Sequence, residues 1–239
     1  MKPYKGKESK KVQVQSMFDR IAPTYDRLNH LLSFEFDRLW RRRVVRMVAR
    51  QSPREILDVA TGTADLAIAL AREIPEAHVT GVDLSEQMVV LGQEKVRRAA
   101  LSQRVRLETG DAERMTSPDG CFDAVTVAFG VRNFQDLPQG LAEMYRVLRE
   151  GGSCYVLEFS RPTHPLFAPL YRFYFHRVLP VVGGIVSRDR AAYDYLPHSV
   201  DEFPARRRFE ELMRDAGFTD VRSVSLMGGI AYIYSGCRA

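Results

Sequence analysis

Acidic side chains follow three successive β-type runs of the sequence. Asp58 closes the first run, Asp83 directly follows the second, and Asp111 lies shortly after the third. The carboxyl ends of parallel strands meet at one edge of a sheet, so these acids are expected to lie close together. Asp83 can accept both hydroxyls of a ribose, Asp111 can accept an adenine amino group, and the backbone N–H of Ala112 can bind the ring. Each acid alone is more often a helix cap or a turn residue, but the ordered set predicts an adenosyl ligand.

The turn after the first β-type run narrows the choice of ligand. It leads through Gly62 and Thr63 into a helix, as nucleotide-binding loops do. Asp58 before this turn and Asp65 after it would repel the diphosphate of a dinucleotide, whereas S-adenosylmethionine carries a sulfonium and an ammonium group. We therefore expect S-adenosylmethionine as the cofactor. A dehydrogenase remains an alternative, and equilibrium binding of NADH would distinguish the two.

The acids belong to a regular alternation of strands and helices from residue 54 to residue 158. The predicted strands cover residues 54–59, 78–82, 105–107, 122–127 and 154–159, and the predicted helices cover 65–73, 86–100 and 137–149. Such an alternation predicts a parallel, doubly wound sheet. Ligands bind such sheets at the carboxyl ends of the strands, which is where the acids lie.

Two parts of the chain depart from this alternation. Apolar residues at helical spacing over 12–50 predict a helical cap behind a disordered N-terminal arm, and residues 160–202 form an aromatic-rich insertion. A helix over 204–215 precedes two β-type runs that are joined at Gly228-Gly229, which predicts a hairpin. We therefore predict one α/β domain over residues 1–239, with arm and cap in 1–50 and a substrate-facing or membrane-facing insertion in 160–202. Its doubly wound, mostly parallel seven-stranded sheet ends in an antiparallel hairpin.

Composition and charge are those of an ordinary globular protein. Of the 239 residues, 45% are hydrophobic and 27% are charged, and the formal net charge is +5. Two arginine triplets, at 41–43 and 206–208, suit nucleic acid, an anionic membrane face or a solvated helix face. The three cysteines lack metal-type spacing and no apolar stretch follows the basic N-terminus. We therefore expect core thiols, no metal, no signal peptide and a cytoplasmic protein.

Longer motifs identify a family. The sequence resembles the demethylmenaquinone and ubiquinone-biosynthesis C-methyltransferases from about residue 16 to the end. The motifs that carry the resemblance include Met17–Asp26, Leu57–Asp65, Gly110–Glu113, Ala128–Phe134 and Tyr193–Val200. The resemblance implies methyl transfer from S-adenosylmethionine to a ring carbon of a polyprenylated quinol, and it favours demethylmenaquinol over a benzoquinol.

The resemblance also implies roles for particular residues. It places cofactor contacts on Thr63, Asp83, Asp111 and Ala112, with Asp58 and Gly62 nearby. Ala64 stands where many members have glycine, so its methyl group is expected to narrow the space beside the cofactor. Ala128 stands where some members have serine, so one hydroxyl contact is absent.

Carbon methylation of a quinol needs help at the substrate hydroxyl. A phenolate pushes charge onto the ring carbons, so the site must favour loss of the phenol proton. Arg132 is expected to stabilise the phenolate, Asn133 to orient the same oxygen, and Tyr25 to close over the pocket and relay a proton. The alternatives are an ion pair of Arg132 with Asp136 and simple packing of Tyr25. Among the histidines, only His198 is a candidate base.

The insertion and the rival functions remain open. The apolar segment 167–182 suits a prenyl tail, a membrane surface that Arg172 and Arg177 would contact, or ordinary packing on the sheet. An RNA methyltransferase would suit the basic pI, but the chain has neither a Pro-Pro-aromatic stretch nor a cysteine after the fourth strand. We therefore expect no nucleic-acid partner. A membrane-binding module without enzyme activity and the oligomeric state also stay open.

Overall fold

Short runs of apolar and β-branched residues form a seven-stranded sheet in the order β3-β2-β1-β4-β5-β7-β6. The computed structural model describes residues 1–162, 167–187 and 189–239. The side chains of residues 167, 170, 172, 182 and 185–187 lie outside this description, and with them the expected lipid contact of Arg172. The strands are β1 (Glu55–Val59), β2 (His78–Asp83), β3 (Val105–Thr109), β4 (Phe122–Ala128), β5 (Leu148–Phe159), β6 (Thr219–Leu226) and β7 (Ala231–Cys237).

The first five strands are parallel, and the last two reverse direction. Strand β7 pairs antiparallel with β5, and β6 pairs antiparallel with β7. Strands β6 and β7 are joined by Met227–Gly229, where Gly228 and Gly229 both have positive φ, as a tight turn requires. The predicted C-terminal hairpin is therefore confirmed.

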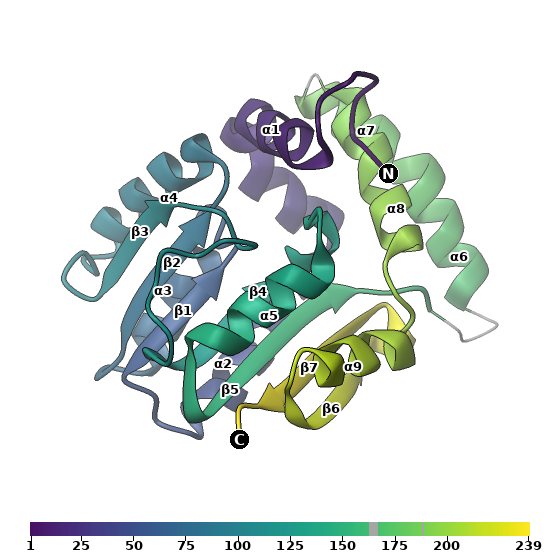
Figure 1. Ribbon diagram of the computed structural model, residues 1–239. Coiled ribbons are helices and arrows are strands. Elements are labelled where there is room, and N and C mark those ends of the chain that lie inside the picture. Colours follow the sequence, from purple (N-terminus) through teal and green to yellow (C-terminus); the bar gives the residue numbers. More distant parts are fainter. Residues whose placement is uncertain (163–166, 188) are drawn as a thin grey trace.

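Helices cover both faces of the sheet (Figure 1). One face carries α2 (Phe36–Ala49), α3 (Asp65–Glu73) and α4 (Glu86–Arg98), whose apolar sides pack with the sheet in one buried cluster. The other face carries α5 (Leu137–Val147) and α9 (Arg206–Asp215), which pack in a second cluster. This confirms the predicted doubly wound α/β arrangement.

A third layer lies over the carboxyl ends of the parallel strands (Figure 1). It consists of α1 (Lys10–Leu32) and the insertion, which folds as α6 (Phe167–Phe173), a π-helical turn over Tyr174–Val178, α7 (Leu179–Ser187) and α8 (Arg190–Glu202). Apolar residues of α1 and of the insertion form one buried cluster. Of the predicted cap, α1 covers the same edge of the sheet as the insertion, whereas α2 packs on a face of the sheet. Within the described residues, the helices are too short or too polar to cross a membrane.

Two further details differ from the sequence predictions. Strand β5 begins at Leu148, before the predicted start at residue 154, because Leu148 already pairs with Phe122 of β4. The register then shifts, with Gly151 at a φ of 76°, and regular pairing resumes at Ser153. The N-terminal arm is not disordered as expected but lies against the cap. The Tyr4 hydroxyl donates to Asp189 at 2.6 Å, and the guanidinium of Arg20 lies 5.0 Å from the centre of the Tyr4 ring. The backbone N–H of Tyr4 also donates to the Gln13 side chain at 2.9 Å, so these contacts hold the arm against α1 and the insertion.

Candidate active site

The cofactor loop connects β1 to α3, and Asp83 at the end of β2 holds it in place. Oδ2 of Asp83 accepts the backbone N–H of Gly62 at 2.8 Å, and Oδ1 accepts that of Ser85 at 2.9 Å. Burial raises the pKa of Asp83 to about 6, although both backbone donors oppose the shift. Each carboxylate oxygen can accept a second hydrogen bond, so Asp83 can still bind a pair of ribose hydroxyls.

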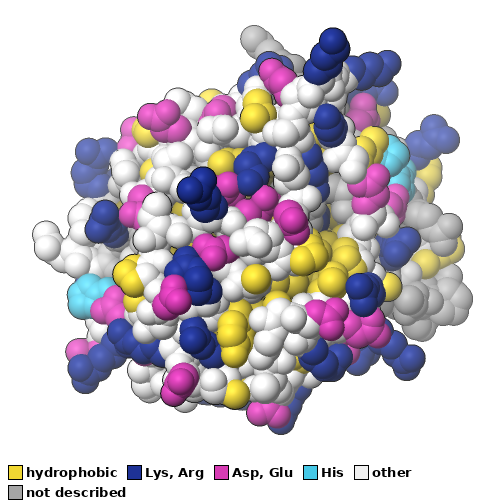
Figure 2. Space-filling view, in the orientation of Figure 1, with side chains coloured by type: hydrophobic (Ala, Val, Ile, Leu, Met, Phe, Trp, Pro, Cys, Tyr) yellow, Lys and Arg dark blue, Asp and Glu magenta, His cyan; other side chains and the backbone are white. Residues whose placement is uncertain are grey.

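A cavity opens above this loop and brings together most of the predicted cofactor residues. Gly62, Asp83, Asp111 and Ala112 all line it, and so does Ala128. In the space-filling view, acidic side chains gather near the middle of the face with an apolar strip beside them (Figure 2). Of the three acids whose spacing predicted a shared cavity, Asp83 and Asp111 do share one.

Two predicted cofactor residues do not line this cavity. Asp58 is buried below it, and its carboxylate accepts the hydroxyls of Thr61 and Thr126, each at 2.7 Å. Burial raises the pKa of Asp58 to about 6. The hydroxyl of Thr63 donates to Asp26 of α1 at 2.5 Å. Asp58 therefore ties β1 to β4, and the Thr63 side chain ties the loop to the cap. A cofactor role for either residue stays a prediction.

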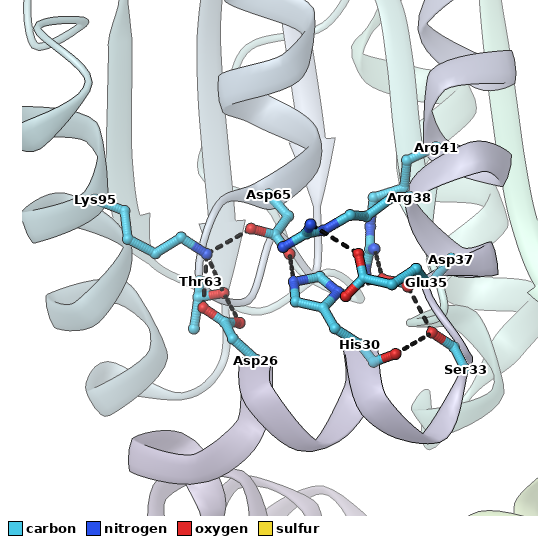
Figure 3. Close-up of polar contacts among 10 residues, drawn as sticks. All are labelled: Asp26, His30, Ser33, Glu35, Asp37, Arg38, Arg41, Thr63, Asp65 and Lys95. Carbon is cyan, nitrogen blue, oxygen red and sulfur yellow. Dashed lines mark hydrogen bonds and ion pairs between the residues drawn. The ribbon is translucent and has the colours of Figure 1, made fainter.

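A polar network joins the cap to the cofactor loop on the outer side of Thr63 (Figure 3). The ammonium of Lys95 lies 2.7 Å from Asp26 and 3.0 Å from the Thr63 hydroxyl, and it also pairs with Asp65. His30 lies between two carboxylates, 2.9 Å from Asp37 and 3.5 Å from Asp65. Helices α1, α2, α3 and α4 thus meet in one hydrogen-bonded cluster that fixes the position of the cap over the site.

Lys11 occupies the adenine end of the cavity, where sequence reasoning placed only acids. Its ammonium lies 2.7 Å from Asp111 and 2.8 Å from Glu113. Burial alone would lower the pKa of Lys11, but hydrogen bonds to the two carboxylates raise it, so the group stays charged. The lysine pair at the start of α1 resembles a solvated helix end in the sequence, and no local signal reveals this long-range contact.

A larger apolar chamber of about 260 Å³ adjoins the cofactor cavity. Four residues line both spaces, namely Phe18, Tyr25, Phe129 and Asn133. Phe129 holds a left-handed φ of 61° and stacks on Phe159 with ring centres 4.4 Å apart. A bulky residue in this conformation is strained, and such strain is concentrated at functional sites. The two spaces therefore meet at a rigid aromatic junction.

Unpaired polar atoms gather around the chamber. Among the described residues, six buried side-chain polar atoms lack a hydrogen-bond partner, and five of them belong to residues that line the chamber. These five are Nε of Arg132, Oδ1 of Asn133 and the hydroxyls of Tyr171, Tyr193 and Tyr195. Buried polar groups are nearly always paired in folded proteins, so five in one apolar space indicate a ligand with polar atoms of its own.

Arg132 forms a buried ion pair, but with a different partner from the one considered. Its Nη1 lies 2.7 Å from Glu158 at the end of β5, and the two side chains are 4% and 0% exposed. Asp136 instead caps α5 by accepting the backbone N–H of Gln139 at 3.1 Å. The ion pair holds the guanidinium at the chamber wall and leaves its Nε free for a ligand.

Of the two further candidates, Tyr25 lies at the site and His198 lies outside it. Tyr25 packs edge-to-face on Phe18 with ring centres 5.9 Å apart, and burial raises its pKa. It therefore lies between the two spaces as a protonated phenol, which suits both the packing role and the lid role. His198 is exposed, meets His176 edge-to-face with ring centres 6.0 Å apart, and does not line the chamber. Its candidacy as a base is wrong, because α8 turns this side chain away from the site.

Close backbone contacts explain two small residues of the site. The Ala64 methyl group does not narrow the cofactor space as expected, because it points toward Gly92 of α4 and is fully buried. Ala64 nevertheless has a left-handed φ of 68°, which glycine adopts more easily. A side chain at Gly130 would come within 2.6 Å of Ala60, so the loop after β4 can approach the cofactor loop only with glycine there.

Comparisons with known proteins show the family of the chain. The model of the ubiE/COQ5 methyltransferase family matches residues 5–238. A ubiquinone/menaquinone biosynthesis C-methyltransferase UbiE of Geotalea uraniireducens is 47% identical over 225 residues, covering 94% of this chain and 95% of the relative. A demethylmenaquinone methyltransferase of Porphyromonas gingivalis is 46% identical, covering 99% and 97% of the two chains.

Solved structures with the same fold are more distant in sequence. The [4+2]-cyclase SpnF superimposes with a TM-score of 0.69 at 19% identity over 95% of this chain and 96% of its own. A SAM-dependent methyltransferase of Thermotoga maritima gives a TM-score of 0.66 at 19% identity over 94% and 99% of the two chains. These likenesses show the fold alone.

Proposed function

The chain belongs to the ubiE/COQ5 methyltransferase family, and from this premise we propose that it methylates a ring carbon of a prenylated quinol, with demethylmenaquinol as the principal substrate. The observation that supports this substrate is the apolar chamber whose wall carries five unpaired polar atoms. A naphthoquinol combines an apolar ring system with two hydroxyls, so it matches both properties. A benzoquinol of the ubiquinone pathway has the same oxygens and is the second candidate.

The residues of the smaller cavity fit S-adenosylmethionine as the methyl donor. Its wall carries the carboxylates of Asp83, Asp111 and Glu113, and the one cation that the described residues place there, Lys11, is already paired. Such a wall suits a cationic adenosyl ligand and disfavours a diphosphate. In this proposal Asp83 holds the ribose, and Asp111 and the Ala112 N–H hold the adenine. S-adenosylmethionine supplies a methyl group that its sulfonium already activates, so the proposal includes no metal ion.

The residues of the chamber favour the phenolate form of the substrate. Arg132 contributes a buried positive charge beside the ring oxygen, and a nearby cation lowers the pKa of a phenol. Burial raises the pKa of Tyr195 to about 12 and raises that of Tyr171 further, so both remain hydrogen-bond donors. Loss of the quinol proton places negative charge on the ring carbons. A ring carbon then attacks the donor methyl group while the bond from that methyl group to sulfur breaks, so the donor leaves as a neutral thioether. The methylated ring carbon loses its proton and the ring oxygen takes one up, which restores the aromatic quinol, so one proton is released overall.

The aromatic junction aligns the two reactants and excludes water. Phe18, Tyr25 and Phe129 separate the two spaces, so the ring can face the donor cavity only between them. Holding two reactants in line in this way contributes about 7–11 kcal/mol toward lowering a barrier. Asn133 lines both spaces and orients the substrate oxygen. We further propose that the prenyl tail follows the aromatic insertion and that the protein works on the cytoplasmic face of a membrane.

The proposal is tested with a matched pair of tyrosine variants. Tyr195 and Tyr234 both have buried, unpaired hydroxyls, but only Tyr195 lines the chamber. With labelled S-adenosylmethionine and reduced demethylmenaquinone in detergent, we expect Tyr195→Phe to lower the rate of methylation by about tenfold, because one charged hydrogen bond is lost. Tyr234→Phe is expected to retain the rate. Label that enters only RNA, or equal losses in both variants, would contradict the assignment.

A further inference from the structure

The turn between α1 and α2 exposes an unusual number of large apolar side chains. Leu31, Phe34 and Leu39 are 62%, 67% and 53% exposed, and Phe36 is 36% exposed. Phe34 also has a left-handed φ of 51°, a conformation that is unfavourable for an aromatic residue. An exposed ring held in a strained backbone gains nothing for the stability of the fold. Exposed apolar groups that cluster in this way mark a contact surface.

This turn lies at the mouth of the quinol chamber. Phe34 and Phe36 line the chamber and are also exposed, and the chamber therefore reaches the surface beside them. The ring of Phe34 lies 5.6 Å from that of Tyr174, which joins the turn to the insertion. If the substrate is a prenylated quinol, as proposed above, it enters from a lipid phase, and its entrance must meet that phase.

A basic cleft of about 490 Å³ begins where the apolar turn ends. It lies between α2, α3 and α4, and among the described residues its wall carries six lysines and arginines but a single acid. These residues are Arg38, Arg41, Arg42, Arg72, Lys95, Arg98 and Asp65. Several of the cations have carboxylate partners, as Figure 3 shows for Arg38, Arg41 and Lys95. Arg42 and Arg72 have no ion-pair partner within the described part of the chain, so the cleft retains positive charge for an external anion.

From these neighbouring features we propose that the α1–α2 turn and the basic cleft form a membrane-docking site that binds the phosphate of an anionic phospholipid headgroup. The apolar turn inserts between acyl chains, and Arg42 and Arg72 bind the headgroup. Insertion of apolar side chains combined with attraction of cations to anionic lipid is the general physics of such docking. The proposal rests on the quinol function, because it explains how the mouth of the chamber reaches its substrate.

The test measures binding to vesicles of phosphatidylcholine alone and of phosphatidylcholine mixed with phosphatidylglycerol. We expect the protein to bind only the anionic vesicles strongly. Reversal of both free cleft charges, Arg42→Glu with Arg72→Glu, should weaken binding about tenfold or more. The matched control reverses Arg207 and Arg222, two exposed arginines elsewhere that also lack an ion-pair partner among the described residues. This control should bind within about twofold of the wild type.

The apolar half of the site has its own pair of variants. Leu31→Ser with Leu39→Ser should also weaken vesicle binding about tenfold, and neither residue lines the chamber. The control is Val12→Ser with Val90→Ser, which are exposed apolar residues outside the turn. Equal losses in variants and controls, or displacement of the protein from vesicles by inorganic phosphate or RNA at low concentration, would overturn the docking site. A soluble quinol without a prenyl tail should be methylated equally by all variants. Failure of the wild type on that substrate would instead count against the quinol function.

Discussion

The buried pair of Arg132 and Glu158 allows stability to be separated from catalysis. Replacing Glu158 by glutamine keeps its shape but leaves the Arg132 charge buried without a counter-ion. Loss of one partner of a buried pair costs about 3–5 kcal/mol. In a protein of this size, each 1 kcal/mol lowers the melting temperature by about 2–4 °C, so Glu158→Gln should melt about 6–20 °C below the wild type.

The double variant separates the effect of the pair on stability from its effect on catalysis. Arg132→Met with Glu158→Gln removes both charges, and the glutamine oxygen can still accept the backbone N–H of Phe159, which Oε1 of Glu158 accepts at 2.8 Å. Only the longer hydrogen bond from the backbone N–H of residue 132 to Oε2, at 3.3 Å, is lost. Replacement of both buried charges by neutral groups is often close to neutral for stability. We therefore expect the double variant to unfold within about 1 kcal/mol of the wild type and yet to lose about a hundredfold or more in methyl transfer, because the phenolate has lost its cation.

The single variant Arg132→Met tests the direction in which stability changes with pH. Burial already raises the pKa of Glu158, and removal of Arg132 raises it further. A carboxyl group whose pKa is raised in the folded state destabilises the fold at pH values above its unfolded pKa of about 4.5. Arg132→Met should therefore regain stability as the pH falls toward about 5, whereas Glu158→Gln should not. Urea unfolding at several pH values and initial rates of methyl transfer measure these effects. A double variant as unstable as the sum of the two singles, or one that is still active, would refute the reasoning.

Three further predictions concern the cofactor loop and its neighbours. Ribose hydroxyls favour the ionised form of Asp83, whose pKa is about 6, so affinity for S-adenosylmethionine should fall by up to about tenfold per pH unit below that value. Calorimetric titration between pH 5 and pH 8 measures this, and a flat profile would exclude Asp83 as the ribose acceptor. Lys11→Met frees Asp111 for the adenine, so the KM for S-adenosylmethionine should fall about two- to fivefold. An unchanged KM would show that the ion pair between Lys11 and Asp111 does not compete with the cofactor. Ala64→Gly relieves a left-handed φ, so it should lower the free energy of unfolding by about 1–2 kcal/mol less than Ala67→Gly in the regular helix α3. Thermal unfolding measures both, and equal losses would argue against strain at residue 64.

The sequence predicted the fold well because local signals determine most of it. Alternating strands and helices restrict the chain to a parallel sheet, and the parallel topology then brings the ends of β1, β2 and β3 to one edge. This is why Gly62, Asp83, Asp111 and Ala112 were correctly expected in one cavity. No knowledge of side-chain packing was needed for that step.

The directions of side chains and the contacts between distant segments were harder to predict from the sequence. Asp58 and Thr63 lie next to the cofactor loop in sequence, but their oxygens bind Thr126 and Asp26, which are distant along the chain. The same holds for the pairing of Arg132 with Glu158 instead of the nearby Asp136. Sequence spacing favours a near partner, whereas the sheet places the end of β5 beside the end of β4.

The position of the new methyl group distinguishes methylation of a ring carbon from methylation of a quinol oxygen. The protein is incubated with demethylmenaquinol and S-adenosylmethionine carrying a carbon-13 methyl group, and the product is analysed by NMR and by reoxidation. We expect a methyl signal on a ring carbon and a product that air oxidises to a methylated quinone. A methyl signal on oxygen, in an ether that can no longer form a quinone, would exclude carbon methylation.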